Sequence, residues 1–163
     1  MSWFNQDGLL VKFGREAGVA GIAGEFEDLE FGQHVLEINL DLTKLASTAA
    51  ILDDNINIPS DYTIMQVDVI ATTAATSGGS ATLNVGLIQR DRSTNISDTA
   101  LVSALALTAI DSAGETNKLT VGSTGAGGSI GATPGYKAYV TAKYGTAAFT
   151  AGVVKIRVIS QKV

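Results

Sequence analysis

Apolar and polar residues alternate with a period of two along several stretches of this chain. Residues 35–42, VLEINLDL, show the pattern most clearly, with these apolar positions: Leu36, Ile38, Leu40 and Leu42. The pattern returns in residues 61–72, 81–89, 136–145 and 152–160, with these apolar positions: Met65, Val67, Val69, Leu83, Val85, Leu87, Tyr136, Ala138, Val140, Ala142, Tyr144, Val154, Ile156 and Val158. A period of two is typical of strands that bury one face. We therefore predict half-buried strands at all five places.

Shorter segments predict further elements. Residues 8–13, GLLVKF, predict a first strand, and Ile56 and Ile58 predict a short one. The KLTV segment within residues 112–120 predicts another strand, while residues 43–54 form either a helical turn or a loop.

One segment favours a helix. In residues 97–111, SDTALVSALALTAID, either Ser97 or Asp98 is a suitable N-cap. Three apolar residues then fall on one side of the helix: Leu101, Val102 and Leu105.

Two long segments resemble each other and set the predicted architecture. Residues 67–88 and 137–159 both contain a strand pattern, an Ala/Thr-rich tip and a second strand pattern, which predicts two similar hairpins. Many short strands with glycine-rich turns, and no alternation of strands with long helices, indicate an all-β fold. We predict an antiparallel β-sandwich or jelly roll with one short helix.

The first 31 residues differ from the rest of the chain. Residues 14–31 carry four closely spaced glycines at 14, 18, 21 and 24, which disfavour a helix and predict an extended arm or loop. We therefore divide the chain into an N-terminal arm and Gly-rich acidic segment, 1–31, and a β-sandwich domain, 32–163. The arm carries the residues that we predict to bind a partner: Trp3, Phe4, Leu9, Phe13, Phe26 and Phe31. The alternative, that residues 1–13 form an edge strand of their own domain, stays open.

Composition and charge exclude several classes of function. The chain has no cysteine, which excludes disulfides, thiolate zinc sites and cysteine nucleophiles. We find no signal-peptide pattern and no apolar run of the roughly 18 residues that span a membrane, so we expect no membrane partner. The net charge of -5 also makes general nucleic-acid binding unfavourable. Residues 1–68 hold twelve acids and three bases, whereas residues 69–163 hold four acids and eight bases. This asymmetry favours head-to-tail contact between copies or docking on a charged surface, unless the fold interleaves the two halves.

Candidate catalytic and metal-binding residues do not form a known motif. His34 is the sole histidine, and no serine lies in a G-x-S-x-G elbow. The DDNINIPSD segment begins like a calcium loop, but Ile58 and Ile64 stand where that loop needs Gly and Glu. A cation site built from three aspartates, or a solvated turn, remains open there: Asp53, Asp54 and Asp61. The acids of GEFEDLEF, which include Glu25 and Glu27, indicate a solvated face rather than a glycosidase pair.

The glycine-rich segment STGAGGSIG does not match a phosphate-binding loop. Gly128 stands where the Walker pattern needs Lys, and Ile130 stands where the dinucleotide pattern needs Gly. We interpret the segment as a flexible loop. We predict that the protein is not an enzyme and that it binds no cofactor and no metal.

The opening MSWFNQDGLLVKFGREAG resembles the start of capsid decoration or cement proteins, which are minor head proteins of tailed bacteriophages. The matching residues are these: Trp3, Phe4, Asn5, Asp7, Gly8, Leu9, Lys12, Phe13 and Gly14. The resemblance continues in VGLIQRD, with Val85, Gly86, Leu87 and Asp91, in SAGETNKLTVGS and in YGTAAFTAGVVKIRV.

This resemblance implies a virion protein that binds the outer surface of a phage capsid and stabilises the shell. It implies the major capsid protein as partner, a homotrimer, a location on the capsid surface and synthesis in the host cytoplasm. The alternative is a head-fibre or receptor-binding β-sandwich module that recognises host surface glycan. The tyrosines argue against that alternative, because most of them lie in or beside strand patterns rather than in loops.

Overall fold

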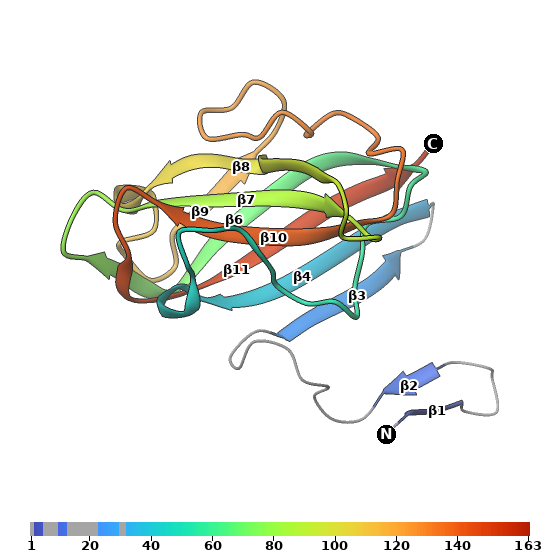
Figure 1. Cartoon of the computed structure of the whole chain (residues 1–163), viewed down its shortest axis with the longest axis horizontal. Helices are drawn as coiled ribbons and strands as arrows, with labels where there is room; N and C mark the ends of the chain where they lie inside the picture. Colours follow the sequence, from blue (N-terminus) through green and yellow to red (C-terminus); the bar gives the residue numbers. More distant parts are fainter. Residues whose placement is uncertain (1, 5–9, 13–22, 30–31) are drawn as a thin grey trace.

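The computed structural model describes residues 2–4, 10–12, 23–29 and 32–163 of the chain, with side chains from residue 32 onward. The described residues form two large antiparallel β-sheets that face each other (Figure 1). The five-stranded sheet has the order β3 (Ala23–Leu29), β4 (Gln33–Asp41), β11 (Phe149–Lys162), β6 (Tyr62–Ser77) and β9 (Thr116–Leu119). The four-stranded sheet has the order β5 (Ala50–Ile51), β10 (Ala138–Gly145), β7 (Thr82–Gln89) and β8 (Asn95–Ala106). The predicted all-β sandwich is confirmed.

A small third sheet pairs the two strands nearest the N-terminus. These are β1 (Ser2–Phe4) and β2 (Leu10–Lys12), and neither pairs with a strand of the two large sheets. The named helices are single 3-10 turns, η2 (Leu42–Lys44) and η3 (Leu107–Ala109). No helix within the described ranges is long and apolar enough to cross a membrane.

The hydrophobic core lies between the two large sheets and follows the predicted alternation. The inward residues of β4, β6, β7 and β11 are at most 1% exposed: Leu36, Ile38, Leu40, Val67, Val69, Leu83, Val85, Leu87, Val154, Ile156 and Val158. Complete burial of one such side chain contributes about 1.5–3 kcal/mol. Three inward positions of β10 are buried as predicted: Ala138, Val140 and Ala142. Tyr136, in contrast, precedes the strand and is exposed.

Met65 is the predicted inward residue of β6 that the structure places outside. It is 48% exposed, whereas Ile64 is fully buried. The pairing with β11 explains the difference, because Ile159 pairs with Gln66 but Ser160 pairs with Ile64. One residue of β6 is therefore skipped in a β-bulge, and the alternation restarts on the other side of it.

The predicted helix over residues 97–111 is wrong, because most of this segment is strand β8. Its pairing with β7 is irregular: from the pair Val85–Val102 to the pair Leu87–Ser97, β7 advances two residues while β8 advances five. Such bulges disrupt the period of two. The apolar residues of β8 therefore have a spacing that imitates a helix.

The prediction of two hairpins is also wrong. The strand before each Ala/Thr-rich tip and the strand after it lie in different sheets, since β6 and β11 belong to the five-stranded sheet and β7 and β10 to the four-stranded sheet. The two similar segments are therefore connections between sheets. Strand β6 also continues to Ser77, so most of the first predicted tip is strand.

Other segments differ in detail from the prediction. The predicted strand at Ile56 and Ile58 is reduced to one isolated bridge, between Ile58 and Ala138. Residues 23–29, expected within an arm or loop, form strand β3, which pairs with β4 along its whole length. The division of the chain at residue 31 stays a prediction.

Candidate interaction surface

The outer face of the four-stranded sheet carries a polar cluster where β8 crosses β7. A Cβ atom placed on Gly86 of β7 would lie 2.3 Å from the carbonyl oxygen of Ser97 and 2.6 Å from the Cα atom of Asp98. Only glycine leaves room for the β8 backbone at this distance. The bulge in β8 therefore places the backbone of Asp98 against Gly86, on the outer face of the sheet.

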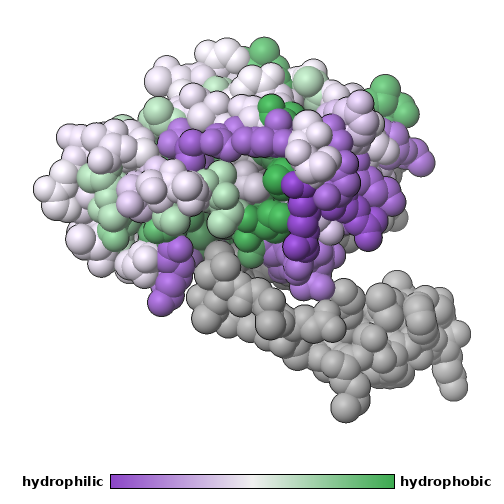
Figure 2. All heavy atoms as spheres, viewed as in Figure 1, coloured by the Kyte–Doolittle hydropathy of each residue, from purple (hydrophilic) through white to green (hydrophobic). Residues whose placement is uncertain are grey.

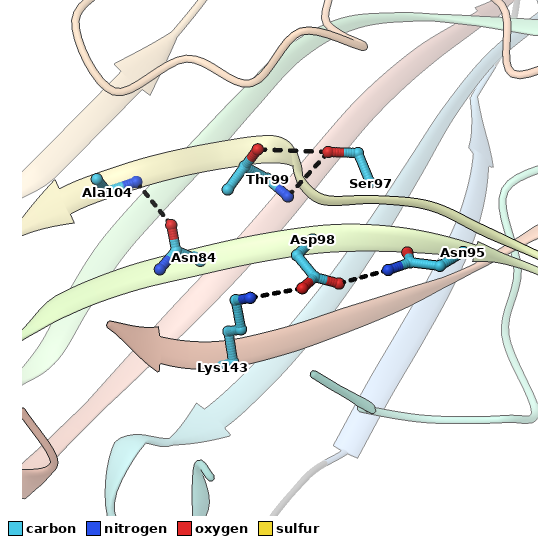
Figure 3. Close-up of polar contacts among 7 residues, drawn as sticks. All are labelled: Asn84, Asn95, Ser97, Asp98, Thr99, Ala104 and Lys143. Atoms are coloured by element: carbon cyan, nitrogen blue, oxygen red, sulfur yellow. Dashed lines mark hydrogen bonds and ion pairs between the residues drawn. The ribbon is translucent and has the colours of Figure 1, made fainter. Parts of the chain in front are cut away.

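The carboxylate of Asp98 joins β8 to β10 (Figure 3). Lys143 of β10 donates from Nζ to Oδ2 at 2.5 Å, and Asn95 donates from Nδ2 to Oδ1 at 2.7 Å. The hydrogen bond from Lys143, followed by that from Asn95, lowers the pKa of Asp98 below its ordinary value. Asp98 is therefore an anion at neutral pH, and its ion pair with Lys143 links β8 to β10.

Side chains of the same cluster satisfy the backbone groups that the irregular strand leaves without ladder partners. Asn84 is 7% exposed, and its Oδ1 accepts a hydrogen bond of 2.9 Å from the backbone N–H of Ala104. Ala104 has a φ of 50°, which is rare for a residue with a Cβ atom. The hydroxyl of Ser97 accepts from the N–H of Thr99 at 3.1 Å (Figure 3). These hydrogen bonds therefore hold the irregular part of β8 in one conformation.

Two loops next to this face are tied to it. The guanidinium of Arg92 lies 5.8 Å from the ring centroid of Tyr139 and forms an ion pair of 3.0 Å with Asp54. A hydrophilic band crosses this side of the molecule beside a hydrophobic area (Figure 2). Such a surface presents charges and hydrogen-bonding groups at fixed positions, which suits recognition of another protein.

The outer face of the five-stranded sheet carries a row of charged residues. The strand register places five of them side by side across the whole sheet, from β3 to β9: Glu25, Glu37, Arg157, Asp68 and Lys118. Within the row, Arg157 donates from Nε to Glu37 Oε1 at 2.6 Å, and Lys155 donates to Oε2 at 3.2 Å. Burial raises the pKa of Glu37, but the hydrogen bonds from Arg157 and Lys155 outweigh it, so the pKa is lowered.

Three of the six residues that we predict to bind a partner lie in the first three strands. Trp3 and Phe4 belong to β1 and pair with Val11 and Leu10, and Phe26 of β3 pairs with Leu36 of β4. The remaining three lie outside the described residues: Leu9, Phe13 and Phe31. Their role in binding a partner stays a prediction.

The candidate catalytic and cation-binding residues have structural positions. His34 is 1% exposed, its ring lies edge-on to Tyr62 at 5.2 Å, and the Ser160 hydroxyl lies 3.5 Å from its Nδ1. Ser160 is fully buried as well. In the DDNINIPSD segment, Asp53 accepts a hydrogen bond of 2.8 Å from the N–H of Asn55. The part of the chain that the structure describes contains no group of three or more His, Asp and Glu residues placed to hold a metal ion.

The glycine-rich loop, which we predict to be flexible, covers the edge of a strand. It runs beside the outer edge of β8, where Ser103 donates to the Gly125 carbonyl at 2.8 Å and Gly127 donates to the Leu101 carbonyl at 3.0 Å. A Cβ atom on Gly127 would lie 2.2 Å from the Ala100 carbonyl oxygen. The glycines therefore let a loop approach β8 closely and cover its edge, which a pattern of glycines alone does not reveal.

These features define an antiparallel β-sandwich whose distinctive sites are polar surfaces. No model of a known protein family matches the chain, and no curated protein matches it. Two chains of solved structures are similar to it. One belongs to the acid-stable capsid structure of Helicobacter pylori bacteriophage KHP30, with a TM-score of 0.51 and 11% identity over 86% of this chain and 92% of that chain. The other belongs to the capsid asymmetric unit of cyanophage Pam1, with a TM-score of 0.48 and 18% identity over 94% of each chain. At this identity, the similarity to the KHP30 chain shows a shared fold.

Proposed function

We propose that the protein is a structural component of a phage virion that binds the outer surface of the capsid and stabilises the shell, as a decoration or cement protein. One observation carries the proposal: the fold is shared, over nearly the full length of both chains, with a chain of a phage capsid structure. The resemblance of the opening residues to decoration proteins supports the same role. Under this proposal the protein is not an enzyme.

The partners follow from the same proposal. The protein binds the major capsid protein, associates with itself as a homotrimer, and resides on the capsid surface after synthesis in the host cytoplasm. Many copies bound around a symmetric shell reach high avidity although each contact is weak. A rigid sandwich with fixed polar groups suits this role, because little side-chain freedom is lost when it binds.

The strands nearest the N-terminus supply the proposed anchor. A two-stranded sheet is marginally stable in isolation, and β1 and β2 pair only with each other among the described strands. Contact with a capsid subunit or another copy would stabilise these strands. Trp3 and Phe4 would bury aromatic surface in that contact.

A capsid-binding experiment tests the proposal. Purified protein is added to capsids assembled without it, and the mixture is sedimented. We expect the protein to sediment with the capsids to a saturating ratio and to raise the temperature at which they disrupt. The proposal fails if the protein stays in the supernatant while the capsids are intact.

A further inference from the structure

Each of the two large sheets has two edge strands. In the four-stranded sheet these are β8, to which the glycine-rich loop bonds, and the two-residue strand β5. Beside β5, Leu52 and Ile58 donate to the carbonyls of Val140 and Ala138 on β10, at 3.0 and 2.8 Å. In the five-stranded sheet, the edge strands are β3 and β9. Among the described residues, no backbone group forms a hydrogen bond to the outward side of either strand. Unpaired edges of this kind can pair with another chain.

The row of charged residues across the five-stranded sheet ends at these two edge strands with opposite charges. Glu25 of β3 stands at one end, opposite Glu37, and two like charges in direct register destabilise a sheet. Glu37 is already bonded to Lys155 and Arg157. Lys118 of β9 stands at the other end, is exposed, and forms no ion pair with any described residue. An acidic edge and a basic edge thus lie on opposite sides of one sheet.

We propose that two copies of the chain associate head to tail, with the β3 edge of one copy joining the β9 edge of the next. This joins the five-stranded sheets and brings the Lys118 position of one copy beside the Glu25 position of its neighbour. Neighbouring strands of the sheet are all antiparallel, so the two edge strands β3 and β9 run in the same direction. When the sheet of one copy continues into the sheet of the next, β9 and β3 therefore meet as parallel strands. A head-to-tail contact of this kind closes into a ring or grows into a filament.

Pairing of identical edges is disfavoured by the same charges. If β3 met β3 of a second copy, acids two residues apart on this strand, Glu25 and Glu27, would approach the same acids of the other copy. If β9 met β9, Lys118 would approach Lys118. The head-to-tail arrangement is the one that brings unlike charges together at both edges.

Charge exchange tests this interface in solution, without capsids. Self-association is measured by sedimentation velocity over a range of protein concentrations at low ionic strength, with Glu25→Lys, Lys118→Glu and the double variant. Each single variant should require about tenfold more protein to associate, because an attraction becomes a repulsion, and the double variant should associate like the wild type. Lys137→Glu is the matched control, since Lys137 is exposed and lies outside both edge strands. Thermal melts establish that each variant is folded.

The alternatives give different results. A wild type that stays monomeric throughout overturns the proposal, as does a double variant that associates no better than the single ones. Loss on Glu25→Lys with no effect of Lys118→Glu would also overturn it and would indicate a different partner for β3. The proposal rests on the self-association that the proposed function includes, and it names the two edge strands that meet. Its failure would leave capsid binding, measured by sedimentation with capsids, unaffected.

Discussion

The Cα atom of Asp98 on β8 lies only 2.6 Å from the position that a Cβ atom on Gly86 of β7 would occupy. This contact lets the irregular part of β8 lie across the outer face of the sheet. It also brings the Asp98 carboxylate to Lys143 on β10. A single glycine therefore decides whether the polar cluster on this face can form.

Substitution of Gly86 by alanine should destabilise the protein. The added methyl group would meet backbone atoms of Ser97 and Asp98, which cannot move without breaking the β7–β8 pairing, so we expect a loss of about 1–3 kcal/mol. Urea denaturation measures the loss. Gly128→Ala is the matched control, because a Cβ atom there meets nothing within 4 Å. Equal stability of the two variants would show that β8 does not cross β7 as described.

The Asp98–Lys143 ion pair should make the free energy of unfolding depend on pH in the acid range. The folded-state pKa of Asp98 is lowered, so its contribution is complete above the ordinary aspartate pKa of about 4 and is lost as the pH falls through the folded-state pKa. Asp98→Asn should cost about 1 kcal/mol or less at neutral pH, since both side chains are partly exposed. The difference from the wild type should shrink below about pH 4. A difference that is constant from neutral to acid pH would contradict the assignment.

The bulge in β6 predicts that substitution of Met65 costs little free energy of unfolding, in contrast to substitution of a core residue of the neighbouring strand β11. Ile156→Ala should cost about 2–5 kcal/mol, because Ile156 is fully buried between the sheets. Met65→Ala should change the free energy of unfolding by about 0.5 kcal/mol or less, because Met65 is 48% exposed. Both values come from denaturant titrations. A large loss for Met65→Ala would instead place this side chain in the core.

Deletion of residues 1–13 should separate partner binding from folding. Strands β1 and β2 pair with neither large sheet, so the sandwich should keep its melting temperature within a few degrees. Binding to capsids, or association of copies, should weaken. A truncated protein that unfolds at a much lower temperature would show that these residues belong to the domain itself.

The sequence predicts the sandwich because strict alternation marks the strands with regular pairing. β4, β7 and β11 each bury the side chains that the period of two selects. The pattern fails where the ladder is irregular. Bulges in β8 disrupt the period of two, which is why the sequence predicts a helix there. In β6, a bulge leaves Met65 exposed although Ile64 beside it is buried. Local periodicity does not encode such changes of register.

The interaction surfaces were less predictable because they depend on which strands become neighbours. Glu37, Arg157 and Asp68 lie far apart in the sequence and meet only in the five-stranded sheet. The glycines of residues 122–131 suggested flexibility, whereas Gly127 permits a close backbone contact with Ala100. The excess of acids in residues 1–68 was visible in the sequence, but its significance at the β3 edge requires the strand order.

The most direct test of the proposed function is cryo-electron microscopy of virions that contain this protein. The proposal predicts density for the two-sheet sandwich at symmetric positions on the outer surface of the capsid, with the N-terminal strands in contact with a capsid subunit or another copy. Absence of the sandwich from the outer surface, or its presence only in a fibre that projects from the particle, would contradict the proposal.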